Sequence, residues 1–153
     1  MSDRLIRLSW RELAIAADVG CQRRIRSMAE GLNDAYGYNG EGDIWTREVN
    51  GAAAEMAVAK FFNRYWEAGV NTFKAPDVEG VQVRHTTRED GCLIIREHDP
   101  PDELYVLVIG APPTFRIAGA LYGRQAKRPE WLRDPGGVRP AYFVPQDALE
   151  EAA

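Results

Sequence analysis

Glu55 is the residue whose type and position point most directly to chemistry. Residues 51–62 have the composition of a helix, and Glu55 falls within its apolar stripe, sharing one face at 3.6 residues per turn with Ala52, Ala59, Phe62 and Trp66. A carboxylate buried without a partner is costly, so it takes up a proton, pairs with a cation or binds a metal ion. The sequence leaves open whether Glu55 binds a metal ion or is neutralised by an arginine of the core. Glu48 lies on nearly the same face and is a rival candidate. It is close to the expected helix start, however, where the helix dipole stabilises an acidic side chain whether or not that side chain has a function.

A short extended segment after this helix carries three more polar candidates, Asp77, Gln82 and Arg84. Pro76 fixes the entry to Asp77, and Gly80 suits a turn or a bulge. In residues 81–84 valine alternates with Gln82 and Arg84, so the two polar side chains should point to one face of a strand and the valines to the other. This pattern alone is also typical of a half-exposed strand without any function.

The helix and the strand together resemble the PD-(D/E)XK nuclease superfamily. The similarity covers about the middle third of the chain and consists of Glu55, then Pro76-Asp77, then Gln82-Val-Arg84. It implies that Asp77 and Gln82 hold Mg²⁺, with Mn²⁺ as a substitute, and that Glu55 completes the metal shell. Gln82 stands where Glu is usual, but its carbonyl oxygen can still bind a hard cation. Arg84 stands where a Lys usually positions or activates water; arginine cannot act as a base, yet it can clamp a phosphate.

The resemblance therefore implies a DNA-directed, metal-dependent phosphodiesterase with Glu55, Asp77, Gln82 and Arg84 as its catalytic residues. The alternative is a catalytically inactive binding or accessory protein that contacts DNA or a protein partner, in which Arg84 pairs with Glu55 or Asp77. A third hypothesis is an unrelated α+β interaction domain. The chain is also similar to small uncharacterised proteins carried by bacteriophages of high-GC bacteria, on the strength of the runs 75–78, 82–84 and 126–132.

Basic side chains are concentrated late in the chain. Residues 114–140 carry six basic against two acidic side chains, a net charge of +4, so the remainder carries −8. A local basic patch on an acidic protein fits phosphate contact, and it fits a solvated surface equally well. The nucleic-acid-binding candidates of this segment are Arg116, Arg124, Lys127 and Arg128. An earlier cluster, Arg23, Arg24 and Arg26, is expected on the solvated side of a helix, with DNA-backbone contact as the alternative.

Composition limits the class of protein. A chain of 153 residues suits a single domain, residues 1–153, with a core of its own. A net charge of −4 argues against a general nucleic-acid coat. No apolar run of about 18 residues predicts a membrane span, and the N-terminal residues have no apolar signal segment. Cys21 and Cys92 lack a spacing motif, which indicates reduced thiols and a cytoplasmic protein.

The order of the expected elements predicts an α+β fold: N-terminal helices followed by a mixed, mostly antiparallel sheet of four to five strands, with the Glu55 helix packed on it. Ser9 and Glu12 form a capping box that should start a helix, which Gly20 should interrupt. The Glu55 helix should end near residues 68–69.

Among the strands, residues 104–109 are almost continuously apolar, which is typical of a central strand covered on both faces. Residues 81–86 and 92–96 should form a hairpin through a turn at Asp90-Gly91. Residues 33–43 should form a loop, which could lie over a metal site.

Overall fold

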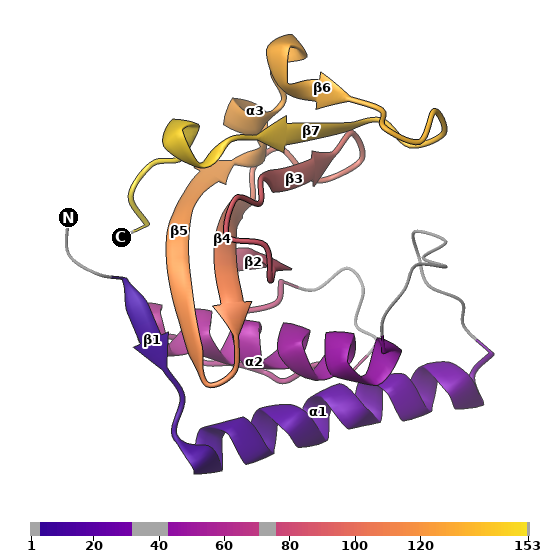
Figure 1. The fold of residues 1–153 in the computed structure, drawn as a ribbon, viewed down its shortest axis with the longest axis vertical. Helices are drawn as coiled ribbons and strands as arrows, with labels where there is room; N and C mark the ends of the chain where they lie inside the picture. Colours follow the sequence, from indigo (N-terminus) through magenta and orange to yellow (C-terminus); the bar gives the residue numbers. More distant parts are fainter. Residues whose placement is uncertain (1–3, 32–42, 71–75, 153) are drawn as a thin grey trace.

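A computed structural model describes residues 4–31, 43–70 and 76–152, and it has the α+β fold that the sequence predicts (Figure 1). Two long helices, α1 (Trp10–Ala29) and α2 (Ile44–Phe62), precede every described strand except β1 (Leu5–Arg7). The later strands are β2 (Val81–Thr86), β3 (Leu93–Arg96), β4 (Leu104–Ala111), β5 (Thr114–Tyr122), β6 (Leu132–Arg133) and β7 (Ala141–Val144). The short helical turns are α3 (Gly123–Ala126), η1 (Pro129–Trp131) and η2 (Gln146–Ala148).

The strands form two sheets. The larger sheet has the order β1-β5-β4-β2, in which β4 pairs antiparallel with β5 and parallel with β2. The smaller sheet, β3-β7-β6, is antiparallel. The hairpin expected between residues 81–86 and 92–96 is therefore wrong, because β2 and β3 belong to different sheets. The physical reason is that the segment between Thr86 and Leu93 is longer than a two-residue turn, so it does not hold the two strands in register.

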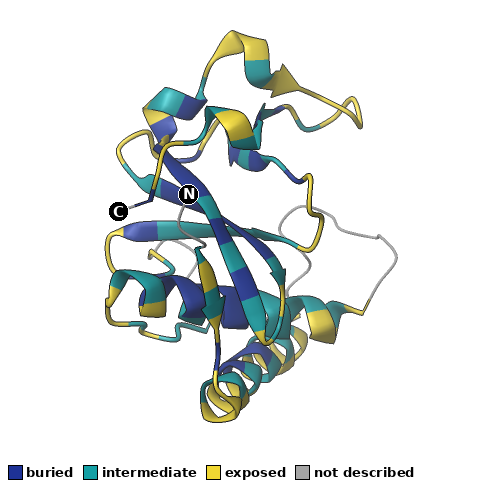
Figure 2. Ribbon diagram, turned by 60° about the vertical axis from the view of Figure 1, so that its left-hand side comes forward, coloured by how far each residue is buried: buried dark blue, intermediate teal, exposed yellow. Residues whose placement is uncertain are grey.

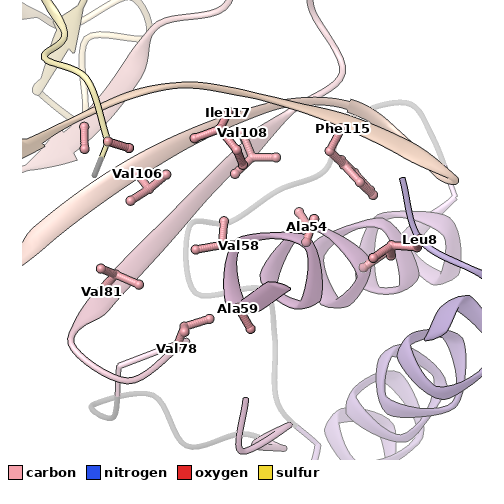
Figure 3. Packing of buried hydrophobic residues seen from close by; sticks show 14 of the residues in the cluster. Leu8, Ala54, Val58, Ala59, Val78, Val81, Val106, Val108, Phe115 and Ile117 are labelled. Carbon is pink, nitrogen blue, oxygen red and sulfur yellow. The ribbon is translucent and has the colours of Figure 1, made fainter. Parts of the chain in front are cut away.

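Two hydrophobic cores lie on the two faces of the larger sheet. On one face, α2 packs its alanines and Val58 against Val106, Val108 and Ile117 (Figure 3). On the other face, Leu107 and its strand neighbours pack against the smaller sheet. β4 is consequently buried along most of its length, as its apolar run predicts (Figure 2).

α1 runs without interruption past Gly20, so the predicted break in this helix is wrong. Its capping box is confirmed: the Glu12 N–H donates to Ser9 Oγ, and the Ser9 N–H donates to Glu12 Oε1. Gly20 is buried against α2, where an added Cβ would lie 2.6 Å from the Val49 Cα. Gly20 therefore allows the two helices to pack closely, and it does not end α1.

α2 ends at Phe62, before the predicted end near residues 68–69. Asn63 follows in the left-handed conformation with φ of 53°, and asparagine is among the few residues that adopt it readily at a helix C-terminus. At the other end, the Asp43 side chain caps the helix by accepting the Trp45 N–H. The rest of the loop predicted at residues 33–43 lies outside the described residues. None of the helices in the described ranges has the length and apolarity that a membrane crossing requires.

We expect Gly20→Ala to lower the free energy of unfolding by about 1–3 kcal/mol, because the new methyl group would overlap α2. Alanine favours a helix, so propensity alone predicts the opposite sign. Gly51→Ala is the matched control: a Cβ at Gly51 meets nothing within 4 Å, and this change should raise the free energy of unfolding by up to about 1 kcal/mol. Urea titration measures both values, and equal stability of the two variants would contradict the close helix packing.

Candidate functional site

Glu55 lies on α2 and is only 8% exposed, as the apolar stripe predicts. Its carboxylate accepts two hydrogen bonds from Arg23 of α1, from Nη1 to Oε2 at 2.7 Å and from Nη2 to Oε1 at 2.8 Å. Trp66 Nε1 also donates to Oε1 at 3.1 Å, and Arg23 Nε donates to the Gly69 carbonyl at 2.9 Å. Both carboxylate oxygens of Glu55 thus accept hydrogen bonds from protein donors. Of the two alternatives that the sequence left open, the structure has the one in which an arginine neutralises Glu55.

The prediction that Arg23 lies on the solvated side of its helix is wrong. The side chain of Arg23 is 15% exposed and points at α2, whereas that of Arg26 is 65% exposed. Helical spacing could have identified it, because the α1 stripe that faces α2 continues through Arg23 from three buried residues: Ala16, Val19 and Gly20.

Asp77 lies just before β2, and its side chain binds a backbone group on the outer edge of that strand. Its Oδ2 accepts the backbone N–H of Val83 at 2.8 Å. Burial raises the pKa of Asp77 to about 6, and the nearby negative charge of Glu55 adds to this shift. The Val83 N–H and the positive charges of Arg84 and Arg23 act in the opposite direction. Asp77 is therefore a second carboxyl group in the electrostatic environment of the Glu55–Arg23 pair.

Gln82 and Arg84 point away from α2. The parallel register places Gln82 beside Tyr105 and Arg84 beside Leu107, and both of these β4 residues belong to the core between the two sheets. The alternating valines of β2 instead join the core under α2. Because successive side chains of a strand point to opposite faces, the sheet separates Gln82 and Arg84 from Glu55.

The contacts of these two side chains are also made on that far face. Gln82 Nε2 donates to Glu103 Oε2 at 2.8 Å. Arg84 Nη2 donates to the buried Asp99 at 2.8 Å, and its guanidinium carbon lies 4.9 Å from the ring centre of Tyr105. Asp99 also accepts the backbone N–H of Arg96, so one buried carboxylate holds the side chain of Arg84 and the backbone of β3.

The structure therefore divides the four predicted catalytic residues between two places. Glu55 and Asp77 lie on the α2 side and at the edge of the sheet, and Gln82 and Arg84 lie on the opposite face. Arg84 pairs with Asp99 rather than with Glu55 or Asp77. The donors of Arg23 and Trp66 compete with a metal ion for the Glu55 oxygens, and Gln82 is turned away. Over the described ranges, no three Asp, Glu, His or Cys side chains gather as a metal site requires.

Two of the four predicted nucleic-acid-binding residues stabilise the fold. Arg116 contacts Glu89 at 2.8 Å and the Gln146 side chain at 3.2 Å, near the start of β5. Lys127 donates to the backbone carbonyls of Glu97 and Asp99, which anchors the turn after β3.

The other two predicted residues, Arg124 and Arg128, are at the surface beyond the far end of β5, with side chains 58% and 59% exposed. Their guanidinium carbons lie 4.6 Å and 5.2 Å from the ring centres of Tyr122 and Trp131. We call these four residues the Arg–aromatic surface. It lies beside the smaller sheet, in the part of the molecule farthest from α1 (Figure 1).

A pocket of about 440 Å³ opens beside β2, on the face that carries Arg84. Three arginines line it, Arg84 from β2, Arg88 from the loop after β2, and Arg96 from β3, together with the apolar side chains of Ile94, Leu107 and Phe143. We call it the arginine pocket. The sequence did not identify Arg88 and Arg96 as site residues, because the expected hairpin would pair β2 with β3, and the pocket requires these two strands to be apart.

No family model matches the sequence, and no curated protein or solved structure is significantly similar to it. The function must therefore be inferred from the side chains of this chain and their contacts. Two kinds of group are relevant: the exposed basic side chains, which suit contact with phosphate, and the carboxylates of Glu55 and Asp77, which are withdrawn from solvent.

Replacing Arg23 by Met should lower the free energy of unfolding by about 3–5 kcal/mol, because the buried charge of Glu55 would lose its partner. Arg26→Met, on the solvated side of the same helix, should change it by less than about 1 kcal/mol. Adding Glu55→Gln to Arg23→Met should restore part of the loss. Urea titration of the four proteins tests the pairing, and an Arg23→Met effect as small as that of Arg26→Met would contradict it.

Asp77→Asn should make the protein more stable above pH 6 by on the order of 1–3 kcal/mol. The folded protein binds the Asp77 proton more tightly than the unfolded chain, because the pKa is raised from 3.8 to about 6. The stabilising contribution of protonated Asp77 is therefore complete below pH 3.8 and is lost as the pH rises through 6. Asparagine keeps an oxygen for the Val83 N–H without the buried charge.

The measurement is the difference in free energy of unfolding between Asp77→Asn and the wild type from pH 4 to pH 8. Taking this difference cancels the titrating groups that do not interact with Asp77, whose contributions the two proteins share. The advantage of the variant should shrink steadily below pH 6, and a difference that does not change with pH would contradict the raised pKa.

Proposed function

We propose that this protein is a nucleic-acid-binding accessory protein that contacts DNA phosphates without a metal ion. The exposed Arg–aromatic surface carries the proposal. Guanidinium groups bind phosphate through paired hydrogen bonds, and exposed aromatic rings offer stacking faces to nucleotide bases. Arg124 lies over the exposed ring of Tyr122, and Arg128 lies over the partly buried ring of Trp131.

The present ion pairs of this surface are easily exchanged. Arg124 lies 3.7 Å from Asp102, whose side chain is 91% exposed, and Arg128 lies 2.9 Å from the exposed Glu130. Pairs of this kind contribute about 0–1 kcal/mol, so a phosphate can replace the carboxylate at little cost. The stacked rings keep both guanidinium groups in place while they remain accessible to a ligand.

The contacts of Glu55 favour binding over catalysis. Arg23 and Trp66 satisfy its carboxylate, which gives this buried acid a structural role without a metal. An inactive relative of the nuclease-like fold, in which the Arg23–Glu55 ion pair takes the place of a metal, is the form of the proposal that these contacts favour.

Fluorescence anisotropy with a labelled DNA duplex in EDTA tests this function. We expect a Kd of about 1–100 μM at low salt, as for non-specific contact with phosphates. Arg124→Gln with Arg128→Gln should weaken binding about tenfold or more and reduce the slope of log K against log salt by about 2. The double change Arg11→Gln with Arg26→Gln removes the same charge from α1, including an arginine stacked on Trp10, and should have a much smaller effect.

Equal losses in the two double variants would mean that only net charge matters, and absence of binding to the wild type would refute the DNA partner. A duplex and a single strand of the same sequence should both be measured, because stacking on Tyr122 and Trp131 favours exposed bases.

The metal-dependent phosphodiesterase is the second candidate, and the raised pKa of Asp77 favours it. A carboxyl group whose charge is opposed by burial and by a neighbouring acid is common at functional sites, and a bound cation would relieve that repulsion. Asp77 would hold Mg²⁺ or Mn²⁺, and Glu55 would join only if Arg23 released it. The metal would supply activation of water and stabilisation of phosphate charge.

Adding Mg²⁺ or Mn²⁺ to the same proteins distinguishes the two candidates. A saturable rise in melting temperature that disappears in Asp77→Asn, together with cleavage of the labelled DNA, would establish the phosphodiesterase and overturn the metal-free function. Binding that is the same in EDTA and in Mg²⁺, with intact DNA, is the result that the accessory protein predicts.

A further inference from the structure

The arginine pocket is separate from the Arg–aromatic surface and has a different shape. It is a hollow of about 440 Å³, which is within the size range of small-molecule sites. One wall comes from the β2 edge of the larger sheet and another from β3 and β7 of the smaller sheet. A pocket bounded by two sheets selects a ligand by size, which an open surface does not.

The charge of the pocket favours an anion. Three of its lining side chains are arginines. Its acidic lining residue, Asp90, is exposed and pairs with Arg88, and the carboxylate of Asp99 pairs with Arg84 from outside the lining, so the arginines exceed the acids by one charge. His85 also lines it, but burial lowers the pKa of this histidine, so it adds no charge at neutral pH. Arginines from three separate segments around one volume can together bind the oxygens of one phosphate group.

Asp99 holds the side chain of Arg84 and the backbone at Arg96 before any ligand arrives. Asp99 accepts hydrogen bonds from the Arg84 side chain at 2.8 Å and from the Arg96 backbone at 2.7 Å. Stacking on Tyr105 also restrains the Arg84 guanidinium group. A fixed donor loses less conformational entropy on binding, so the restrained guanidinium group of Arg84 increases the affinity for an anion.

The remaining wall is apolar. Ile94, Leu107 and Phe143 line the pocket beside the arginines, and such side chains suit a flat, weakly polar group rather than a second charge. A ligand that satisfies both walls carries a phosphate at one end and an aromatic group at the other. Nucleotides have this chemistry and this size.

We propose that the arginine pocket binds a mononucleotide-sized phosphomonoester, with the phosphate on Arg84, Arg88 and Arg96 and the base against Ile94, Leu107 and Phe143. This site is independent of the Arg–aromatic surface, so either can exist without the other. The pocket adds recognition of a small ligand to a protein proposed to contact DNA.

Isothermal titration calorimetry with AMP, inorganic phosphate and adenosine tests this site. AMP should bind with a Kd of about 1 mM or tighter, and more tightly than either of its two parts. Arg88→Gln and Arg96→Gln should each weaken AMP binding about tenfold, as expected for loss of a charged hydrogen bond. Arg88 is suited to this test because its side chain is 75% exposed, so its replacement should leave the fold intact.

Arg26→Gln on α1 is the matched control and should leave AMP binding unchanged. Phosphate binding as tight as AMP binding would overturn the role of the apolar wall. Adenosine binding as tight as AMP binding, or equal affinities in Arg88→Gln and Arg26→Gln, would overturn the role of the arginines, and no binding of AMP would overturn the site. The Arg124→Gln, Arg128→Gln protein should bind AMP normally, which separates failure of this site from failure of DNA binding.

Discussion

The burial of β4 on both faces is the constraint on which the rest of the structure depends. Its apolar side chains are shared between two cores, one under α2 and one against the smaller sheet. A strand of this kind must be covered on both sides, because the exposure of either face would cost the transfer free energy of several large side chains. β2 pairs with this strand, and the register decides which of its side chains face α2 and which face the second sheet.

The polar groups around α2 follow from that arrangement. Glu55 is carried into the core by the helix that covers β4, and a charge at this depth requires a partner. Arg23 supplies it from the neighbouring helix, and Trp66 and the Gly69 carbonyl complete the hydrogen bonds. The pair also links α1 to α2 near the place where Gly20 allows their backbones to approach. Burial at the edge of β2 raises the pKa of Asp77, and the nearby charge of Glu55 adds to this effect, so Asp77 keeps its proton to a higher pH.

The seven Lys and Arg side chains from β2 to η1 separate into three groups with different roles. Arg116 and Lys127 are bound to carboxylate, amide or carbonyl oxygens and hold loops to the sheets. Arg124 and Arg128 stack on the rings of Tyr122 and Trp131 and are themselves exposed, so their charge remains available to a partner. Arg84, Arg88 and Arg96 meet in the pocket between the sheets. A charge count along the sequence does not distinguish these roles, because they depend on what each guanidinium or ammonium group already contacts.

The sequence by itself determined the α+β class, the capped start of α1, the central position of β4 and the burial of Glu55. These features follow from local patterns: helical spacing, a capping box and a continuous apolar run. Only the tertiary structure decided three other features. These are the partner of Glu55, the raised pKa of Asp77, and the position of Gln82 and Arg84 on the face of the sheet opposite α2. Each depends on segments distant in the chain, since Arg23 meets Glu55 only through the packing of α1 on α2. The wrong hairpin has the same cause. Local alternation identified β2 and β3 as extended, but β2 pairs with β4 and β3 pairs with β7. The two strands therefore lie in different sheets, and the arginine pocket lies between these sheets.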